Sequence, residues 1–146
     1  GWQIMGGGIG YAINNHLTRL GGKLADALSH GLMDEPVQIH SHGGRVHLMD
    51  SGELKVDVAF LGASAADEFG NANGTGGRSR CGSLGYAMVD ADRANYVIVL
   101  AEDLVAFPCA PASIRQDQVD CVVKVDQIGD PSKISVGAAR ITSNPR

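Results

Sequence analysis

The stretch Val56-Asp57-Val58-Ala59-Phe60-Leu61 is a nearly continuous apolar run, and Gly62 follows it. Two further runs of the same kind occur downstream, Tyr96-Val97-Ile98-Val99-Leu100 and Cys121-Val122-Val123-Lys124-Val125. Short apolar runs bounded by glycine or polar turns are typical of strands that are buried on both faces, as in parallel sheets. The sequence therefore predicts an α/β fold with an open, mainly parallel sheet and flanking helices.

The residues before position 31 favour two short helices. Apolar residues recur at helical spacing over residues 11–20, until Gly21-Gly22 interrupts the pattern. The same spacing restarts at Leu24, and Gly31 is placed to end the second helix. We therefore expect both helices to precede the strands of the sheet.

The segment that follows favours an extended structure. Apolar residues alternate with polar ones from Val37 to Ile39 and again from Val46 to Leu48. This alternation predicts a half-buried strand. The glycine-containing residues 41–45 between the two parts are interpreted as a turn or bulge.

Composition and charge narrow the class of protein. The chain has 146 residues, a length typical of one domain, and its net charge is -4. This charge does not favour nucleic-acid binding, and no apolar run approaches the ~18 residues of a membrane-spanning helix. The three cysteines lack C-x-x-C spacing, and the first residues lack the features of a signal peptide. We therefore expect a protein of the reducing cytoplasm that binds neither nucleic acid nor membranes.

Several short motifs point to cofactors or nucleophiles but are incomplete. The N-terminal glycines do not satisfy G-x-G-x-x-G, and a glycine pair with P-loop spacing is followed by Ser83 where that motif needs lysine. Gly62-Ala63-Ser64 resembles a nucleophile elbow, but all five histidines precede Ser64, whereas the base of that fold follows the serine. His40 and His42 lack a firm fourth ligand, so structural or surface histidines are favoured and no metal site is predicted.

A polar cluster follows the first apolar run. A loop is expected to present Ser64, Asp67, Glu68, Asn71 and Asn73, with glycines between them. In open parallel sheets ligands bind beyond the carboxyl ends of the strands, and glycines let backbone N–H groups approach a ligand closely. The adjacent carboxylates of Asp67 and Glu68 are candidates for a base, a nucleophile or a hydrogen-bond acceptor. From composition alone, an acidic surface turn is an equally good interpretation.

Longer strings in and around this cluster carry a family resemblance. They comprise residues 36–46, 51–62, 67–74, 81–87, 111–114, 116–120 and 142–146. These strings resemble the citrate lyase alpha chain family, and the similarity runs from about residue 22 to the end without large gaps. Residues 1–21 match poorly. We therefore expect a glycine-rich lead and first helix at 1–21, and a partial CoA-transferase-like lobe at 22–146.

The resemblance implies a fold, an activity and partners. The fold is an open α/β sheet of the CoA-transferase type, here incomplete, because the family's chain is longer and has two such lobes. The activity is that of a citrate CoA-transferase, which exchanges acetate for citrate on the thioester of an acyl carrier or of CoA. The implied partners are the citrate lyase beta chain, the acyl carrier gamma chain, citrate and acetyl-CoA, with a homo-oligomer expected. No tightly bound cofactor is implied, because the CoA or acyl-carrier thioester is a substrate.

The implied reaction gives the candidate residues their roles. Exchange between a carboxylate and a thioester passes through an acid anhydride and tetrahedral oxyanions, which backbone N–H groups in a glycine-rich loop stabilise. Gly43-Gly44 and the loop from Gly70 to Gly77 are candidate donors, and Arg45 or Arg78 is a candidate partner for a citrate carboxylate. The predicted catalytic residues are Glu68 and Asp67, with Glu68 expected to position or hydrogen-bond rather than attack. The predicted substrate- or CoA-binding residues are Gly43, Gly44, Arg45, Ser64, Gly70, Asn71, Asn73 and Gly74.

A non-catalytic role is the alternative hypothesis. The family's second lobe is absent from this sequence, so the chain is then a truncated fragment that folds and oligomerises or binds a partner lobe. A sheet without its neighbours has unpaired edges or apolar faces, which favour association. On either hypothesis we expect little or no activity from the isolated chain.

Overall fold

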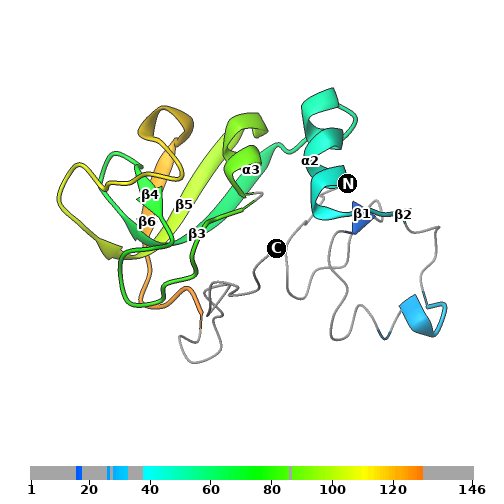
Figure 1. Cartoon of the computed structure of the whole chain (residues 1–146), viewed down its shortest axis with the longest axis horizontal. Coiled ribbons are helices and arrows are strands. Elements are labelled where there is room, and N and C mark those ends of the chain that lie inside the picture. The colour runs from blue at the N-terminus through cyan, green and yellow to red at the C-terminus, as the bar shows by residue number, and fades with distance from the viewer. Residues whose placement is uncertain (1–15, 18–25, 27, 33–37, 86, 130–146) are drawn as a thin grey trace, which may run out of the picture. The chain divides into compact units, whose positions relative to one another are not determined.

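The structure is a computed structural model that describes residues 16–17, 26, 28–32, 38–85 and 87–129 (Figure 1). The chain divides into two compact units, Gly1–Leu54 and Lys55–Arg146. None of the helices in the described part of the chain combines the length and the hydrophobicity that crossing a membrane requires.

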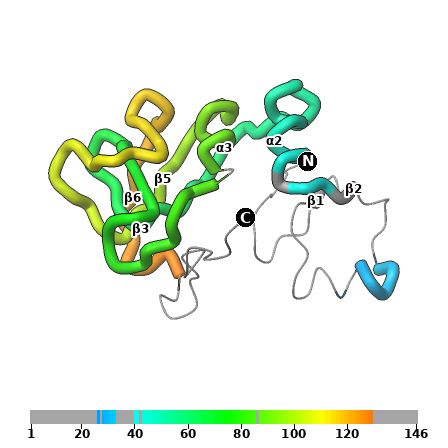
Figure 2. The backbone as a smooth tube through the Cα atoms, in the orientation of Figure 1, coloured from blue at the N-terminus to red at the C-terminus, as the bar shows by residue number. Residues whose placement is uncertain are grey.

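A four-stranded sheet forms the centre of the second unit, with the strand order β4-β3-β5-β6. Its strands are β3 (Val58–Ala66), β4 (Ala72–Asn73), β5 (Tyr96–Leu104) and β6 (Cys121–Lys124). β3 pairs with β5 and β5 pairs with β6 in parallel, whereas β4 runs antiparallel to β3. The three apolar runs therefore form adjacent parallel strands, which confirms the predicted mainly parallel α/β sheet (Figure 2).

One face of this sheet carries the hydrophobic core. Ala59 and Leu61 of β3 and Val97 and Val99 of β5 alternate with more exposed neighbours and are each at most 5% exposed. The helix α3 (Ala87–Arg93) connects the two strands, contacts β3 and adds Ala91 to the same cluster. This packing fixes β3 and β5 side by side, so that their carboxyl ends lie at one edge of the sheet (Figure 1).

The opposite face of the same strands is apolar and exposed. Phe60 is 66% exposed, and Val58, Tyr96 and Val123 are each about 40% exposed. The strand register places these side chains on a common face, because Val58 lies opposite Tyr96, and Val123 lies opposite Leu100. Parallel sheets in α/β proteins have both faces covered by other elements. This exposed face is therefore a surface suited to association.

The strand β3 extends further than the sequence predicted. It runs to Ala66, whereas the prediction ended it at Gly62 and placed Ser64 on the following loop. Ala63, Ser64 and Ala66 are completely buried. Small residues are poor strand formers by themselves, but pairing with β5 on one side and β4 on the other keeps this segment extended.

The first unit contains a short parallel strand pair and a helix. β1 (His16–Leu17) pairs with β2 (Gln38–Ile39), and β2 agrees with the first part of the predicted half-buried strand. The helix predicted over residues 11–20 is wrong at 16–17, because pairing with β2 overrides the helical spacing there; its other residues, like the glycine-rich residues 1–10, lie outside the described residues. Helical backbone at 26 and 28–29, followed by Gly31 with φ +65°, agrees with the second predicted helix.

The helix α2 (His42–Ser51) replaces the predicted turn and second strand segment. Ser41 caps its start, because the Ser41 hydroxyl accepts a hydrogen bond from the Gly44 N–H at 2.9 Å. Gly52 ends it with a left-handed backbone, φ +78°. Val46 and Leu48 therefore lie on a helix, and their short alternation was too brief to separate a period of two from a helical period.

Candidate functional site

The loops that follow the parallel strands meet at one edge of the sheet. β3 is followed by the turn 67–71, and β5 is followed by the loop 105–115. Backbone hydrogen bonds join these segments, because the Val105 N–H donates to the Ala66 carbonyl and the Ala72 N–H donates to the Ile114 carbonyl. This is the edge at which open parallel sheets bind ligands, so the residues around these loops form the candidate site.

Asp67 is a fully buried carboxylate that organises the turn after β3. Its Oδ1 accepts hydrogen bonds from the backbone N–H groups of Phe69, at 3.0 Å, and Asn71, at 3.1 Å. Its Oδ2 accepts from Asn71 Nδ2 and from the Cys109 N–H, both at 2.8 Å. Both oxygens are thus occupied by donors from inside the chain, and this geometry supports a positioning role for Asp67.

The Asp67 carboxyl is a fixed negative charge. Burial raises its pKa, but the hydrogen bonds from Cys109, Asn71 and Phe69 outweigh burial and bring the pKa below its ordinary value of 3.8. The neighbouring Cys109 thiol responds in the opposite sense, because burial and the charge of Asp67 both raise its pKa. At neutral pH the pair is therefore an ionised carboxylate beside a protonated thiol.

Asn73 and Ser64 hold the beginning of the glycine loop, defined here as residues 74–82. Asn73 Oδ1 accepts hydrogen bonds from the N–H groups of Thr75, at 3.1 Å, and Gly76, at 2.8 Å. Asn73 Nδ2 donates to the Pro111 carbonyl at 3.0 Å. Ser64 Oγ donates to the Asn73 carbonyl at 3.3 Å. Both side chains are buried and lie on strands, so the prediction that a loop presents them is wrong.

Asn71 and Gly70 fix the other side of the turn. Asn71 Nδ2 donates to Gln116 Oε1 and Asn71 Oδ1 accepts from the Gln116 N–H, each at 3.1 Å, which joins the turn to the short helix η1 (Gln116–Gln118). Gly70 has φ +107°, and a Cβ at this position would lie 2.7 Å from the Val119 Cβ. The turn therefore needs glycine for both conformation and space.

The glycine loop lies directly against other backbone. A Cβ at Gly74 would lie 2.2 Å from the Gly82 carbonyl oxygen, and a Cβ at Gly77 would lie 2.1 Å from the Ser64 carbonyl oxygen. Gly77 also has φ +69°. These glycines were predicted to let a ligand approach the backbone, but in the structure they allow other backbone groups of the chain to approach it.

Three of the glycine N–H groups predicted as oxyanion donors already have acceptors inside the chain. They belong to Gly44, Gly70 and Gly76, and their acceptors are the Ser41 hydroxyl, the Asp67 carbonyl and the Asn73 side-chain oxygen. A donor that is already satisfied stabilises an oxyanion only by exchanging its partner. These three groups are consequently weaker candidates than the sequence indicated.

Glu68 differs from Asp67 because it is exposed. The adjacent Phe69 packs edge-on against Phe107, with ring centroids 5.1 Å apart and an interplanar angle of 76°. Both rings are more than half exposed, at 54% and 55%. The turn therefore presents a carboxylate beside an aromatic surface, an arrangement that an organic ligand can contact directly.

Gly43, Gly44 and Arg45 lie in the first turn of α2, and Arg45 is 3% exposed. They belong to the first of the two units. The second unit brings together the other predicted residues, Ser64, Asp67, Glu68, Gly70, Asn71, Asn73 and Gly74. The predicted set is therefore divided between two separately described units.

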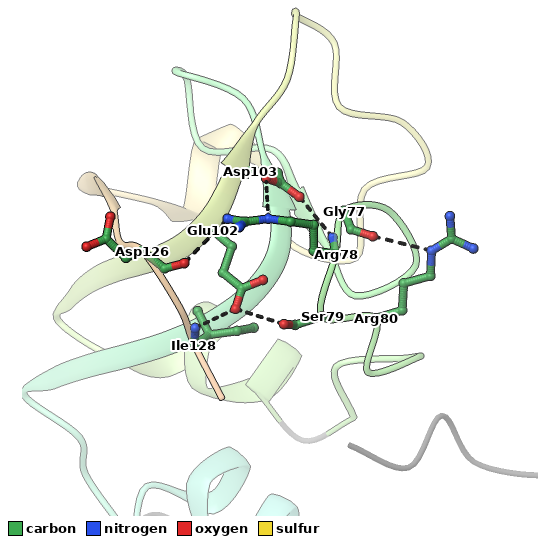
Figure 3. Close-up of polar contacts among 8 residues, drawn as sticks. All are labelled: Gly77, Arg78, Ser79, Arg80, Glu102, Asp103, Asp126 and Ile128. Atoms are coloured by element: carbon green, nitrogen blue, oxygen red, sulfur yellow. Dashed lines mark hydrogen bonds and ion pairs between the residues drawn. The ribbon is translucent and has the colours of Figure 1, made fainter. Parts of the chain in front are cut away.

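Two neighbouring carboxylates that were not predicted from the sequence, Glu102 and Asp103, lie near the end of β5 (Figure 3). Glu102 accepts a hydrogen bond from Ser79 Oγ at 2.8 Å, and Asp103 forms an ion pair with Arg78 at 3.1 Å. The sequence did contain an indication of them, because both residues follow the apolar run 96–100, just as Asp67 follows the apolar run that begins at Val56. The predicted run ended at Leu100, however, so the carboxyl end of the strand was placed too early.

The functional groups gathered among the described residues are carboxylates, amides and thiols. They contain no group of three or more His, Cys, Asp or Glu side chains arranged to hold a metal ion. Cys81, Cys109 and Cys121 are free thiols, and burial raises the pKa of the Cys81 thiol.

Comparisons with known proteins agree on one family. The family model "Citrate lyase, alpha subunit (CitF)" matches residues 8–146 of this chain. A citrate lyase alpha chain from Klebsiella pneumoniae is 65% identical over 131 residues, which cover 90% of this chain and 26% of that protein. The citrate lyase alpha chain of Escherichia coli (strain K12) is 62% identical, with the same coverage of 90% and 26%.

A solved structure extends the agreement to three dimensions. The alpha subunit of citrate lyase from Streptococcus mutans, crystallised in complex with citrate, matches with a TM-score of 0.78 and 49% sequence identity. The match covers 89% of this chain and 26% of the Streptococcus protein. The chain thus spans about a quarter of the length of the relatives it matches. Because the family model covers nearly the whole sequence and the fold agrees, the chain belongs to the citrate lyase alpha subunit family.

Proposed function

We propose that this chain is part of an alpha subunit that acts as the citrate CoA-transferase of citrate lyase. The subunit exchanges acetate for citrate on the thioester of an acyl carrier or of CoA. The observation that carries the proposal is the match over almost all of the chain to relatives named citrate lyase alpha chain, one of which was crystallised with citrate. The thioester is a substrate, and the subunit needs no tightly bound cofactor.

The site supports a division of labour between the two predicted catalytic carboxylates. Asp67 positions the turn, because its oxygens are held by Phe69, Asn71 and Cys109. Glu68 contacts the substrate, because its side chain is exposed in the same turn. Glu68 acts as a hydrogen-bonding or positioning group, and the anhydride forms between the two substrates rather than on the protein.

Two arginines are candidates for binding a citrate carboxylate. They are Arg45 and Arg78, and Arg78 would have to exchange its partner Asp103 to bind a substrate carboxylate. The binding set remains Gly43, Gly44, Arg45, Ser64, Gly70, Asn71, Asn73 and Gly74, of which Ser64, Asn71 and Asn73 act by shaping the loops.

The proposed setting is the cytoplasmic citrate lyase complex. There the alpha subunit works with the beta chain, which cleaves the citryl thioester, and with the acyl carrier gamma chain. Acetyl-CoA substitutes for the acetylated carrier. The exposed sheet face around Phe60 supports homo-oligomerisation, because it leaves an apolar surface to be covered.

The activity of a complete alpha subunit containing this segment tests the proposed function. The purified subunit is incubated with acetyl-CoA and citrate, and acetate release is measured beside a reaction with the isolated chain. We expect turnover by the complete subunit and little or none by the isolated chain, because a site shared with absent segments loses its positioning. A complete subunit that binds citrate but releases no acetate would contradict the proposal.

A non-catalytic role is the second candidate, and the exposed apolar sheet face favours it. In that case the chain folds and associates with itself or with a partner lobe. The same experiment separates the two, because this candidate predicts association of the isolated chain with no acetate release from any form of the protein.

Glu68→Gln in the complete alpha subunit is expected to slow thioester exchange by about 10- to 100-fold, the effect of losing one positioning contact worth ~1.4 to 2.7 kcal/mol of the barrier. Acetate release under saturating citrate and acetyl-CoA measures the change. Glu53→Gln is the matched control, because Glu53 is also an exposed glutamate. Near-complete inactivation, together with a thioester trapped on Glu68 of the unmodified subunit by borohydride, would show covalent catalysis and refute the positioning role.

A further inference from the structure

The strand β5 lies between β3 and β6, and side chains near its carboxyl end bind both the glycine loop and the segment that follows β6. Glu102 and Asp103 are consecutive residues near this end, and consecutive strand residues point to opposite faces of a sheet. Both carboxylates nevertheless bind the same segment, because Glu102 contacts Ser79 and Asp103 contacts Arg78 (Figure 3). The glycine loop is therefore held at two successive residues.

Glu102 forms the buried part of this attachment. Its side chain is 2% exposed, and its Oε1 accepts hydrogen bonds from Ser79 Oγ at 2.8 Å and from the Ile128 N–H at 2.7 Å. These two hydrogen bonds lower the pKa of Glu102, so the buried group is a carboxylate. Burying a charge is unfavourable unless hydrogen bonds compensate it. Here the compensating hydrogen bonds also join β5 to the glycine loop and to the segment after β6.

Asp103 forms the second part. Its Oδ2 accepts from the Arg78 N–H at 2.9 Å, and its Oδ1 accepts from Arg78 Nε at 3.1 Å. The same guanidinium reaches the segment after β6, where Nη2 donates to the Asp126 carbonyl at 3.4 Å. Figure 3 shows Glu102 between Ser79 and Ile128, and Arg78 between Asp103 and Asp126, so the glycine loop is joined both to β5 and to the segment that leaves β6.

The glycine loop also packs tightly against the backbone of β3, so its attachment to β5 affects both strands. Gly77 directly precedes Arg78, and its Cα lies so close to β3 that a Cβ would meet the Ser64 carbonyl oxygen at 2.1 Å. The loop thus packs against β3 and is hydrogen-bonded to β5. A shift at Arg78 or Ser79 is therefore transmitted to the residues that leave β3.

We propose that Glu102 and Asp103 are positioning residues for the transfer step, which hold the glycine loop in its reactive shape through Ser79 and Arg78. This inference rests on the function proposed above and deepens it. Neither carboxylate needs to touch the substrate, because each acts through the loop residue that it binds.

The kinetic test uses the complete alpha subunit with Ser79→Ala and Asp103→Ala. Each change is expected to lower kcat for acetate release about tenfold, with the KM for citrate changing less than about twofold, because positioning acts on the transition state. The double variant should be little slower than the worse single variant, because both changes release the same loop. Glu102→Gln, which keeps an oxygen acceptor, should retain activity within about threefold of the unmodified subunit.

Asp117→Ala is the matched control, because Asp117 also pairs with an arginine Nε, that of Arg115 at 3.0 Å, but both side chains of this pair are more than 60% exposed. It should leave kcat unchanged. If Ser79→Ala and Asp103→Ala alter only the melting temperature, with kcat per folded subunit unchanged, the two carboxylates are merely structural and the proposal is overturned.

Amide hydrogen exchange supplies a readout that does not depend on activity. Ser79→Ala and Asp103→Ala should speed exchange in residues 74–82 by at least about tenfold while leaving the core of β5 unchanged. Unchanged loop exchange would overturn the proposal. An unmodified subunit without transferase activity would refute the proposed function instead, and loop exchange would then decide whether Glu102 and Asp103 hold the loop.

Discussion

Asp67→Asn is expected to lower the free energy of unfolding of the chain by about 3 kcal/mol at neutral pH, more than a typical surface substitution changes it. The Asp67 oxygens each accept two hydrogen bonds, and all four donors are N–H groups of Phe69, Asn71 and Cys109. Asparagine offers one oxygen, so in either orientation its NH₂ group faces two donors. Urea unfolding followed by circular dichroism measures the loss.

Asp117→Asn is the control, because it makes the same chemical change at an exposed ion pair, whose contribution is typically below about 1 kcal/mol. The pH dependence adds a second criterion. The pKa of Asp67 in the folded chain lies below its ordinary value of 3.8, so ionisation stabilises the fold above that value, and the stabilisation is lost as pH falls through the folded pKa. The difference between the unmodified chain and Asp67→Asn should therefore be constant at neutral pH and should narrow in acid below 3.8. Equal losses for both substitutions, or a difference that widens in acid, would contradict the role assigned to Asp67.

The sheet could be predicted because its strands carry their own signal. The runs beginning at Val56, Tyr96 and Cys121 are nearly continuous apolar segments, and that composition is typical of strands in parallel sheets. Their parallel pairing follows from the long connections between them, which leave room for a crossover such as α3. These features depend on local composition and chain length alone.

The errors in the fold occurred where tertiary contacts decide the structure. The end of β3 consists of alanine and serine, which have no strand preference, and the strand continues there because β4 and β5 pair with it. The start of α2 contains two glycines, which disfavour a helix, yet the Ser41 cap and the left-handed Gly52 define one. Strand pairing and helix capping depend on residues outside the segment itself, so the pattern of apolar residues within the segment did not reveal them.

The position of these polar residues in the fold was predicted more accurately than the direction of their side chains. Composition placed polar residues at the carboxyl end of β3, where Asp67, Asn71 and Asn73 do lie. It did not show that these groups are satisfied within the chain, because their partners Cys109, Pro111 and Gln116 are about 40 residues away in sequence. Whether a polar side chain faces a ligand or its own fold depends on such distant contacts.

Gly77→Ala is expected to be the most damaging of the small substitutions in the glycine loop, with a loss of about 3 to 5 kcal/mol in the free energy of unfolding. Two penalties combine at this position. The backbone has φ +69°, which costs an alanine about 1 to 2 kcal/mol. The new Cβ would also lie 2.1 Å from the Ser64 carbonyl oxygen, and backbone cannot rotate away as a side chain can. Urea unfolding of the variant measures the sum.

Substitutions at three other glycines separate the conformational penalty from the steric one, because each glycine has a different combination of φ and space around its Cβ position. Gly85→Ala should show only the conformational cost, since φ is +59° and nothing lies within 4 Å of its Cβ position. Gly74→Ala should show only the steric cost, since its φ is not in the left-handed region but its Cβ would meet the Gly82 carbonyl oxygen at 2.2 Å. Gly62→Ala should be neutral or slightly stabilising, because it has neither problem and alanine loses less entropy on folding. If the loss at Gly77 were no larger than the loss at Gly85, the loop would be free to move away from β3, and the close packing that positions the site would not hold.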